Sequence, residues 1–377
     1  MSSSLKTVTL ALCMIVKDEE QRLERVLQSS HKIFDEIIIV DTGSSDKTKE
    51  IAGKFTEQIF DYKWNDNFAK ARNFSISKCK SEYWMWLDAD DYIEEADVEK
   101  LKQLKSYLKN EYSEPDFFIL PYHYCKGKDS TTKSLVLRER IFKVASKAKF
   151  IYPIHEIVQT SGLKGVTIKD INIYHQDITL ESRKDKTKRN IKLINKALRS
   201  INYKNDLHLQ NHLGLAYLSL GDYKKAIKVY SKCFNECVQR EVGEIEQAKY
   251  LTKIAFCNEK LENYAKTIEL CLQATAFDPF IREPFVLLAQ SFYKLNSLQK
   301  ALFWYQVADS IPLNVQRSSL DASYYNHHVK DAIASIYYLL GDHRQAYEYA
   351  NKALSLAPNS DRLKSNVTKL KRILKIA

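Results

Sequence analysis

Residues 83–92 read YWMWLDADDY, an apolar and aromatic run that ends at the carboxylates of Asp88, Asp90 and Asp91. A buried strand that ends in clustered acids holds them at its carboxyl end, where open α/β sheets bind their ligands. Neighbouring carboxylates repel one another unless a cation or hydrogen-bond donors offset their charge. The charge of such a carboxylate cluster is commonly offset by a divalent ion, which also contacts phosphate oxygens. The alternative is a turn or a helix N-cap rich in Asp, but the sequence on either side favours a cation site.

Short apolar runs alternate with helical segments through the first half of the chain, to about residue 180. Strands are expected at residues 8–16, 36–41 and 83–87, and helices at residues 19–29, 47–55 and 67–79. Further extended segments are expected at residues 117–125, 135–144, 154–158 and 166–175. Because strands and helices alternate at this spacing, we predict a parallel sheet with helices on both faces.

The second half of the chain is helical in pattern, and small residues recur in it with spacings of 12 and then 7 residues. The four triplets are Gly214 with Ala226 and Cys233, Ala255 with Thr267 and Ala274, Ala289 with Ala301 and Ala308, and Ala334 with Ala346 and Ala353. This spacing is typical of tetratricopeptide repeats, helix pairs of about 34 residues whose small residues let the helices approach closely. A generic helical array is the alternative.

These patterns predict three parts of the chain. We expect an α/β domain at residues 1–180, a connecting helix at residues 181–205, and an all-α repeat domain at residues 206–377. The connecting helix is strongly basic between Arg183 and Lys192. Stacked helical repeats form a curved surface, which suits a bound peptide or a second copy of the chain in a homodimer.

Composition narrows the class of protein. The 377 residues include 58 basic and 47 acidic side chains, but the basic ones are spread widely, which disfavours nucleic acid as a partner. Seven cysteines without a CxxC pair indicate a reduced, cytoplasmic protein. The apolar run at residues 8–16 is too short to span a bilayer and leads into charged residues, so we interpret it as a strand and expect no membrane anchor.

Four motifs in the first half follow one another in a characteristic order. They are CMIVKDEE at residues 13–20, IIIVDTGSSDKT at residues 37–48, FAKARNFSI at residues 68–76 and WLDADDYI at residues 86–93. In order and spacing they closely resemble the family 2 glycosyltransferases. With the repeats, the whole chain resembles family 2 enzymes fused to tetratricopeptide repeats, which include bacteriocin peptide S-glycosyltransferases and lipopolysaccharide-core sugar transferases. The resemblance implies a GT-A, Rossmann-like nucleotide-diphospho-sugar transferase domain followed by the repeats.

The resemblance also implies which residues bind the donor. Asp41, at the end of its strand, would contact uracil, and Lys17 would lie in the loop under the nucleoside. Arg72 would reach the nucleotide, although an ordinary surface arginine is the alternative. Asp88 would face the ribose or the metal and Asp90 the metal itself, with Mg²⁺ or Mn²⁺ neutralising the diphosphate as it leaves.

The acceptor side is expected at YPIHEIV, residues 152–158. There the resemblance favours Glu156 as the catalytic base, with His155 as its orienter or as the alternative base. The alternative is that His155 and Glu156 form a buried pair on a strand and have no catalytic role. His175 is either a third metal ligand or a cap of the domain. Arg138 and Arg140 share one strand face and either contact diphosphate or acceptor, or are solvated.

The function implied is that of an inverting enzyme. It would move a hexose from a UDP-hexose or UDP-N-acetylhexosamine to a Cys thiol, or a Ser hydroxyl, of a bacteriocin peptide. A lipopolysaccharide-core or other glycolipid acceptor is one alternative. A non-catalytic scaffold, in which the repeats bind a partner and the α/β domain only senses nucleotide, is another. The intact DADD sequence and the presence of Glu156 favour an enzyme.

Overall fold

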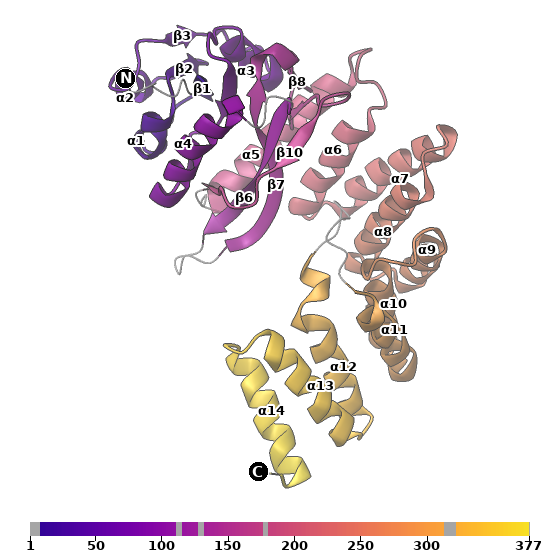
Figure 1. Cartoon of the computed structure of the whole chain (residues 1–377). Coiled ribbons are helices and arrows are strands. Elements are labelled where there is room, and N and C mark those ends of the chain that lie inside the picture. Colours follow the sequence, from indigo (N-terminus) through magenta and orange to yellow (C-terminus); the bar gives the residue numbers. More distant parts are fainter. Residues whose placement is uncertain (1–7, 111–114, 127–131, 176–179, 313–321, 377) are drawn as a thin grey trace. The chain divides into compact units, whose positions relative to one another are not determined.

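A computed structural model describes residues 8–110, 115–126, 132–175, 180–312 and 322–376. The chain forms two compact units, Met1–Ala197 and Leu198–Ala377 (Figure 1). The segment expected to connect two domains contains helix α5 (Leu180–Leu198), and almost all of this helix belongs to the first unit. The side chain of Arg183, at the start of the basic stretch, lies outside the described residues.

A nine-stranded sheet forms the centre of the first unit, and eight of its strands follow the order β3-β2-β1-β4-β7-β6-β11-β5, while β10 pairs with β6. Its strands are β1 (Leu10–Val16), β2 (Glu36–Asp41), β3 (Ile59–Asp61), β4 (Tyr83–Trp86), β5 (Asp91–Tyr92), β6 (Phe117–Lys126), β7 (Thr132–Lys143), β10 (Gly165–Thr167) and β11 (Ile173–His175). The first four strands in this order are parallel, as expected. Strand β7 runs antiparallel to β4 and β6, so the sheet is mixed. A short connection such as that between β6 and β7 can join antiparallel strands only.

Helices cover both faces of this sheet, as predicted. Along β1, Leu12 and Met14 are fully buried on the face covered by α1 (Leu23–Ser30), α2 (Thr48–Gly53) and α4 (Glu95–Asn110). Cys13 belongs to the opposite core, which includes Trp84 and the helix α3 (Phe68–Ile76). Successive side chains of a strand point to opposite faces, so a strand buried on both sides is apolar throughout.

The parallel strands bring their carboxyl ends to one edge of the sheet. In the register of β1 and β2, Val16 lies opposite Asp41, and in that of β1 and β4, Cys13 lies opposite Trp86. The segments that follow these strands begin at Lys17, Thr42 and Leu87 and therefore leave the sheet side by side. The order of the strands thus gathers three of the four sequence motifs at a single edge.

The second unit is made of paired helices. They are α6 (Leu207–Ser219), α7 (Tyr223–Gln239), α8 (Glu244–Lys260), α9 (Tyr264–Phe277), α10 (Glu283–Lys294), α11 (Leu298–Ser310), α12 (His327–Leu339), α13 (His343–Leu356) and α14 (Asp361–Leu374). All twelve residues of the four small-residue triplets are buried, as the repeat prediction requires. At Gly214, an added Cβ would lie 2.4 Å from the ring of Tyr230, which explains why glycine occupies that position.

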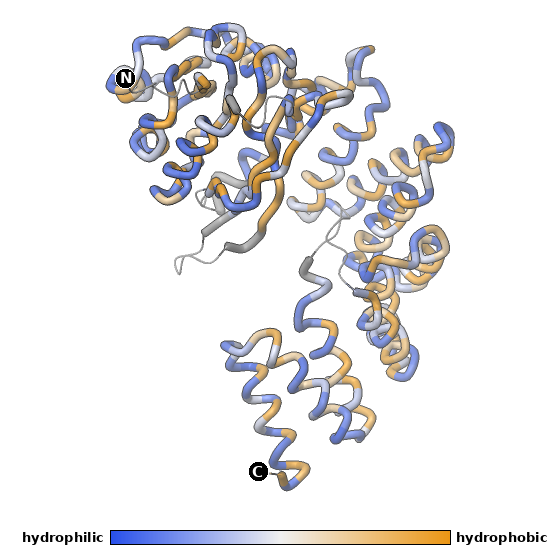
Figure 2. The backbone as a smooth tube through the Cα atoms, in the orientation of Figure 1, coloured by the Kyte–Doolittle hydropathy of each residue, from blue (hydrophilic) through white to orange (hydrophobic). Residues whose placement is uncertain are grey.

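Hydropathy changes over short distances along these helices, and hydrophilic and hydrophobic stretches alternate within each (Figure 2). This alternation is typical of helices that bury one face only. Within the ranges described, no helix combines the length and the apolar character needed to cross a bilayer.

Candidate functional site

A cavity of about 540 Å³ lies at the carboxyl ends of β1 and β4. Five of the predicted site residues line it: Lys17, Arg72, Asp88, Asp90 and His175. The other three, Asp41, His155 and Glu156, are not part of its lining. The remaining lining residues are Ile15, Val16, Asp18, Glu19, Thr42, Trp64, Asp66, Phe68, Ala89, Lys186, Arg189 and Leu193.

Arg72 joins two of the predicted site residues. Its Nη2 donates to Asp88 Oδ1 at 2.6 Å and its Nε donates to Glu156 Oε1 at 2.7 Å, while its side chain is only 8% exposed. Burial opposes ionisation of Asp88, but the charges of Arg72 and Arg140 outweigh it and lower the pKa of Asp88 to about 2. Arg72 is therefore a buried bridge rather than a surface arginine, and it holds Asp88 in its charged form.

Glu156 is positioned by an unusual loop. It lies between the short strands β8 (Phe150–Ile151) and β9 (Ile157–Val158), which pair with each other. Tyr152 and His155 have φ angles of 71° and 52°, in the left-handed region that residues other than glycine rarely adopt. Such conformations persist where the surrounding structure imposes them. The loop thus aims Glu156 at Arg72, and through it at the cavity.

Asp91 and Arg140 form a buried pair beneath the acidic turn. Asp91 Oδ2 accepts from Arg140 Nη1 at 3.2 Å and from the backbone N–H of Asp88 at 3.0 Å, and its Oδ1 accepts from the Tyr122 hydroxyl at 2.6 Å. Arg140 is fully buried, with its guanidinium 3.7 Å from the centre of the Trp86 ring. The solvated strand face considered for Arg138 and Arg140 is therefore wrong for Arg140, which supports the turn from below.

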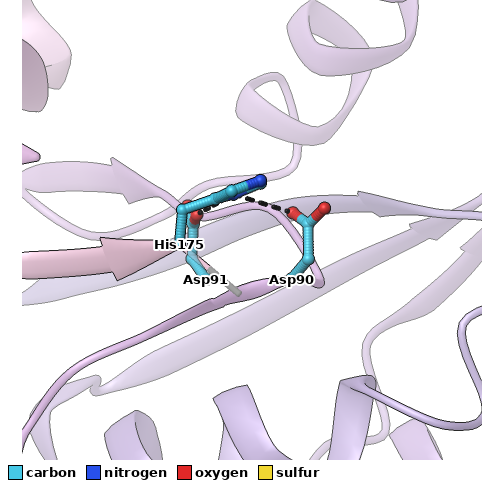
Figure 3. A group of neighbouring side chains, drawn as sticks. All are labelled: Asp90, Asp91 and His175. Carbon is cyan, nitrogen blue, oxygen red and sulfur yellow. Dashed lines mark hydrogen bonds and ion pairs between the residues drawn. The ribbon is translucent and has the colours of Figure 1, made fainter. Parts of the chain in front are cut away.

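Asp90, Asp91 and His175 bring their ligand atoms within 4.8 Å of one another. The Nδ1 atom of His175 lies 3.6 Å from Asp90 and 3.4 Å from Asp91, and Figure 3 shows the imidazole directed toward both carboxylates. Burial, and then the charge of Asp88, raise the pKa of Asp90. Two carboxylates and an imidazole suit a divalent cation such as Mn²⁺ or Mg²⁺, and a cation would relieve this repulsion.

The cluster differs in one member from the expected ligand set. Asp90 and His175 lie together, but Asp88 directs its carboxylate to Arg72, and Asp91 takes the third position. The backbone explains the arrangement, because β5 and β11 pair antiparallel with His175 opposite Asp91. This pairing holds the imidazole beside the acidic turn from a segment 84 residues away.

The side chain of Asp41, at the end of β2, binds the loop that follows this strand. Its Oδ1 accepts from the backbone N–H groups of Gly43 and Ser44, both at 2.9 Å. Its Oδ2 is buried and has no hydrogen-bond partner among the described residues. Its neighbour in the chain, Thr42, lines the cavity.

The structure adds residues to which the sequence analysis assigned no role in the site. Trp64 and Phe68 line the cavity with their ring centres 4.7 Å apart, and aromatic faces stack well on planar rings. Lys186 and Arg189 reach the cavity from α5, outside every motif. Trp64 and Phe68 could have been found from the spacing of the two aromatic residues in WNDNF, residues 64–68. For Lys186 and Arg189, the sequence offered only the basic character of the connecting helix.

Comparisons with known proteins agree with the two units. Residues 11–113 match the model of glycosyl transferase family 2, and residues 207–236 and 328–360 match that of the tetratricopeptide repeat. The chain thus carries a family 2 glycosyltransferase domain followed by tetratricopeptide repeats, which confirms the resemblance and the fold class expected from the sequence.

Curated relatives match parts of the chain. A TPR repeat-containing protein of Synechococcus elongatus is 33% identical over 157 residues, 41% of this chain and 36% of its own length. Glycosyltransferase SunS of Bacillus subtilis is 30% identical over 201 residues, 51% of this chain and 46% of its own length. Glycosyltransferase GlyG of Streptococcus pneumoniae is 29% identical over 143 residues, 34% and 46% of the two lengths. The matches span less than half of each relative.

Among solved structures, MamA matches 48% of this chain and 96% of its own length, at 17% identity and a TM-score of 0.37. That score is too low to support a structural argument.

Proposed function

We propose that this protein is a metal-dependent, inverting glycosyltransferase that moves a hexose from a UDP-sugar to a peptide. One observation carries the proposal: Asp88 and Asp90, at the carboxyl end of β4, line a single cavity with the cations Lys17 and Arg72. Carboxylates that can hold a divalent ion, next to cations that can hold phosphate, suit a nucleoside diphosphate. The family 2 match over residues 11–113 supports the same class of reaction.

Each residue has a proposed role. Asp90 and His175, with Asp91 or Asp88, would hold Mg²⁺ or Mn²⁺, whose charge would offset that of the diphosphate. Lys17 and Arg72 would bind the nucleotide, and the free oxygen of Asp41 would accept from the uracil imide. Trp64 and Phe68 offer a face on which the planar base can stack.

Glu156 is the proposed base. It would take the proton of the acceptor as the acceptor sulfur or oxygen forms a bond to the anomeric carbon. The bond between that carbon and the diphosphate oxygen breaks, and UDP leaves with the electron pair. A single displacement of this kind inverts the anomeric centre. Arg72 joins Glu156 to Asp88, which keeps the base near the donor.

A peptide acceptor suits the second unit. In addition to the curved surface expected of stacked repeats, a groove of about 240 Å³ is lined by residues of α10, α12, α13 and α14. Its walls include Tyr293, Tyr338, Asp331 and Lys369, which offer aromatic faces and both signs of charge. We propose a bacteriocin-type peptide with a Cys or Ser acceptor as the occupant. The described cysteines are free thiols, which suits a reaction in the cytoplasm.

The test uses the full-length protein and a panel of UDP-sugars with Mn²⁺. Intact-mass analysis of candidate peptides encoded nearby should show the mass of one or more hexoses, and chelator should abolish the product. Release of UDP without a peptide would report donor hydrolysis alone. A protein that binds UDP but transfers to none of the peptides or glycolipids tested, and does not hydrolyse any donor, would fit the scaffold alternative and contradict the proposal.

A further inference from the structure

One wall of the cavity comes from α5, the helix that leads to the repeats. Lys186 and Arg189 line the cavity from this helix, and Leu193 follows them. Residues three or four positions apart lie on one face of a helix, so these side chains form a single row. None of them belongs to a family 2 motif, and all lie beyond residues 11–113.

The position of this row is fixed by neighbours in the same unit. Lys196, near the end of α5, pairs with Asp66, which also lines the cavity. The guanidinium of Arg189 lies 5.8 Å from the centre of the Phe68 ring, and Ile194 of the same helix is fully buried. The helix is therefore attached to the segment that contains Asp66 and Phe68, and its cations are held at the cavity.

The partners of these two cations among the described residues distinguish them from Arg72. Within the described ranges, neither Lys186 nor Arg189 has a carboxylate within the 4.0 Å of an ion pair. Arg72, in contrast, is already bound to Asp88 and Glu156. Lys186 lies close enough to Glu19 and Asp90, on the acidic side of the cavity, for its charge to act on both carboxylates.

We propose that Lys186 and Arg189 bind the diphosphate of the donor and stabilise UDP as it leaves. A neutral sugar would gain no charge–charge interaction from two cations in one wall of its site. The negative oxygens of a diphosphate, in contrast, form strong, charge-assisted hydrogen bonds with ammonium and guanidinium groups. This inference rests on the proposed function, because it assigns the leaving-group side of the same site. The donor site would then be completed by the helix that follows the family 2 domain.

The experiment measures nucleotide affinity by calorimetry for full-length Lys186→Gln, Arg189→Gln and the double variant, in Mn²⁺. Lys188→Gln is the matched control, since Lys188 lies on the same helix with 65% of its side chain exposed. Each single variant should bind UDP about tenfold or more weakly, as expected for a hydrogen bond to a charged group. Uridine should bind all of the variants equally, and Lys186→Arg should restore UDP binding.

The outcomes separate this inference from the proposed function. A wild-type protein that binds no UDP would overturn both. If wild type binds UDP and the double variant matches Lys188→Gln in UDP affinity while its thermal midpoint is unchanged, the assignment of Lys186 and Arg189 is wrong. Unchanged UDP affinity with a raised KM for an acidic peptide would likewise overturn it, because the cations would then serve the acceptor.

Discussion

Arg72 donates from Nε to Glu156 at 2.7 Å, although the two residues are 84 positions apart in the chain. The same guanidinium binds Asp88 at 2.6 Å, so the proposed base and the acidic turn share one rigid partner. The planar fork of arginine can serve two carboxylates at once, which the point charge of lysine cannot do equally well. A single side chain therefore links Glu156 to Asp88.

Replacing Glu156 with Gln should lower turnover by about 10²–10⁴-fold, because the amide keeps the size of the side chain but cannot take a proton. Donor affinity should change little. With a thiol acceptor the loss should shrink between pH 7 and pH 9, since a thiol with a pKa of about 8.5 ionises without help. With a hydroxyl acceptor the loss should persist. Unchanged turnover with both acceptors would remove Glu156 from the mechanism and direct attention to His155.

The neighbouring acids Asp90 and Asp91 should respond to substitution in opposite ways. Asp90→Asn should abolish transfer and weaken UDP binding in Mn²⁺ while the free energy of unfolding stays equal or rises, because repulsion within the cluster falls. Asp91→Asn should cost about 3–5 kcal/mol of that free energy, since it leaves the buried Arg140 without its charged partner. Urea titrations of both variants measure the contrast. Equal stabilities would show that Asp91 is not the structural member of the pair.

The free energy of unfolding of the repeats should rise between pH 8 and pH 10.5 because of Lys253. Burial, and then the charge of Lys249, lower the pKa of Lys253 to about 8, below its usual value near 10.5. Between these two pH values the unfolded chain binds more protons, so stability rises with pH, by about 3 kcal/mol in total. Below pH 8 both states are protonated and the folded state retains the cost of the buried charge.

Lys253→Met should therefore raise the urea midpoint of the repeats at pH 7 and remove most of the gain between pH 8 and pH 10.5. Lys266→Met is the control, because Lys266 is half exposed and pairs with Glu269 at 2.7 Å. The buried thiols nearby titrate in all three proteins, and the comparison cancels their effect. A variant with the same pH dependence as wild type would show that Lys253 is charged in the folded protein.

Gly214→Ala should destabilise the repeats without changing UDP affinity. The new methyl group would meet the Tyr230 ring at 2.4 Å, and forcing an extra carbon into a packed interface typically costs about 1–3 kcal/mol. Gly243→Ala provides the control, since a Cβ at that position has no atom within 4 Å. Thermal unfolding and UDP titration of both variants test this. Equal unfolding midpoints would contradict the close approach of α6 and α7.

The sequence predicted those features that local patterns encode. The alternation of strands and helices predicted a parallel sheet, which is confirmed for β1 to β4 but not for β7, and the small-residue spacing indicated the repeats. Helix α4 was missed although Val98, Leu101, Leu104 and Leu108 have helical spacing and are buried. Its signal was available in the sequence.

Other features depend on long-range pairing and could not be read locally. Antiparallel pairing of β5 with β11 decides that Asp91, rather than Asp88, shares a cluster with His175. The burial of Arg140 depends on β7 lying between β4 and β6. Similarly, only the packing of α5 against Asp66 and Phe68 shows that a connecting helix contributes to the cavity.

The pairing of Asp91 with His175 also bears on biosynthesis. Every family 2 motif emerges from the ribosome before β11, yet β11 supplies the imidazole of the cation cluster. A nascent chain arrested before Ile173 would hold the DADD turn without His175, and would be expected to bind Mn²⁺ more weakly than one released after α5. The proposed cation site would then be complete only after β11 has been synthesised. Mn²⁺ binding by ribosome-bound chains of the two lengths would test this, and equal affinities would refute it.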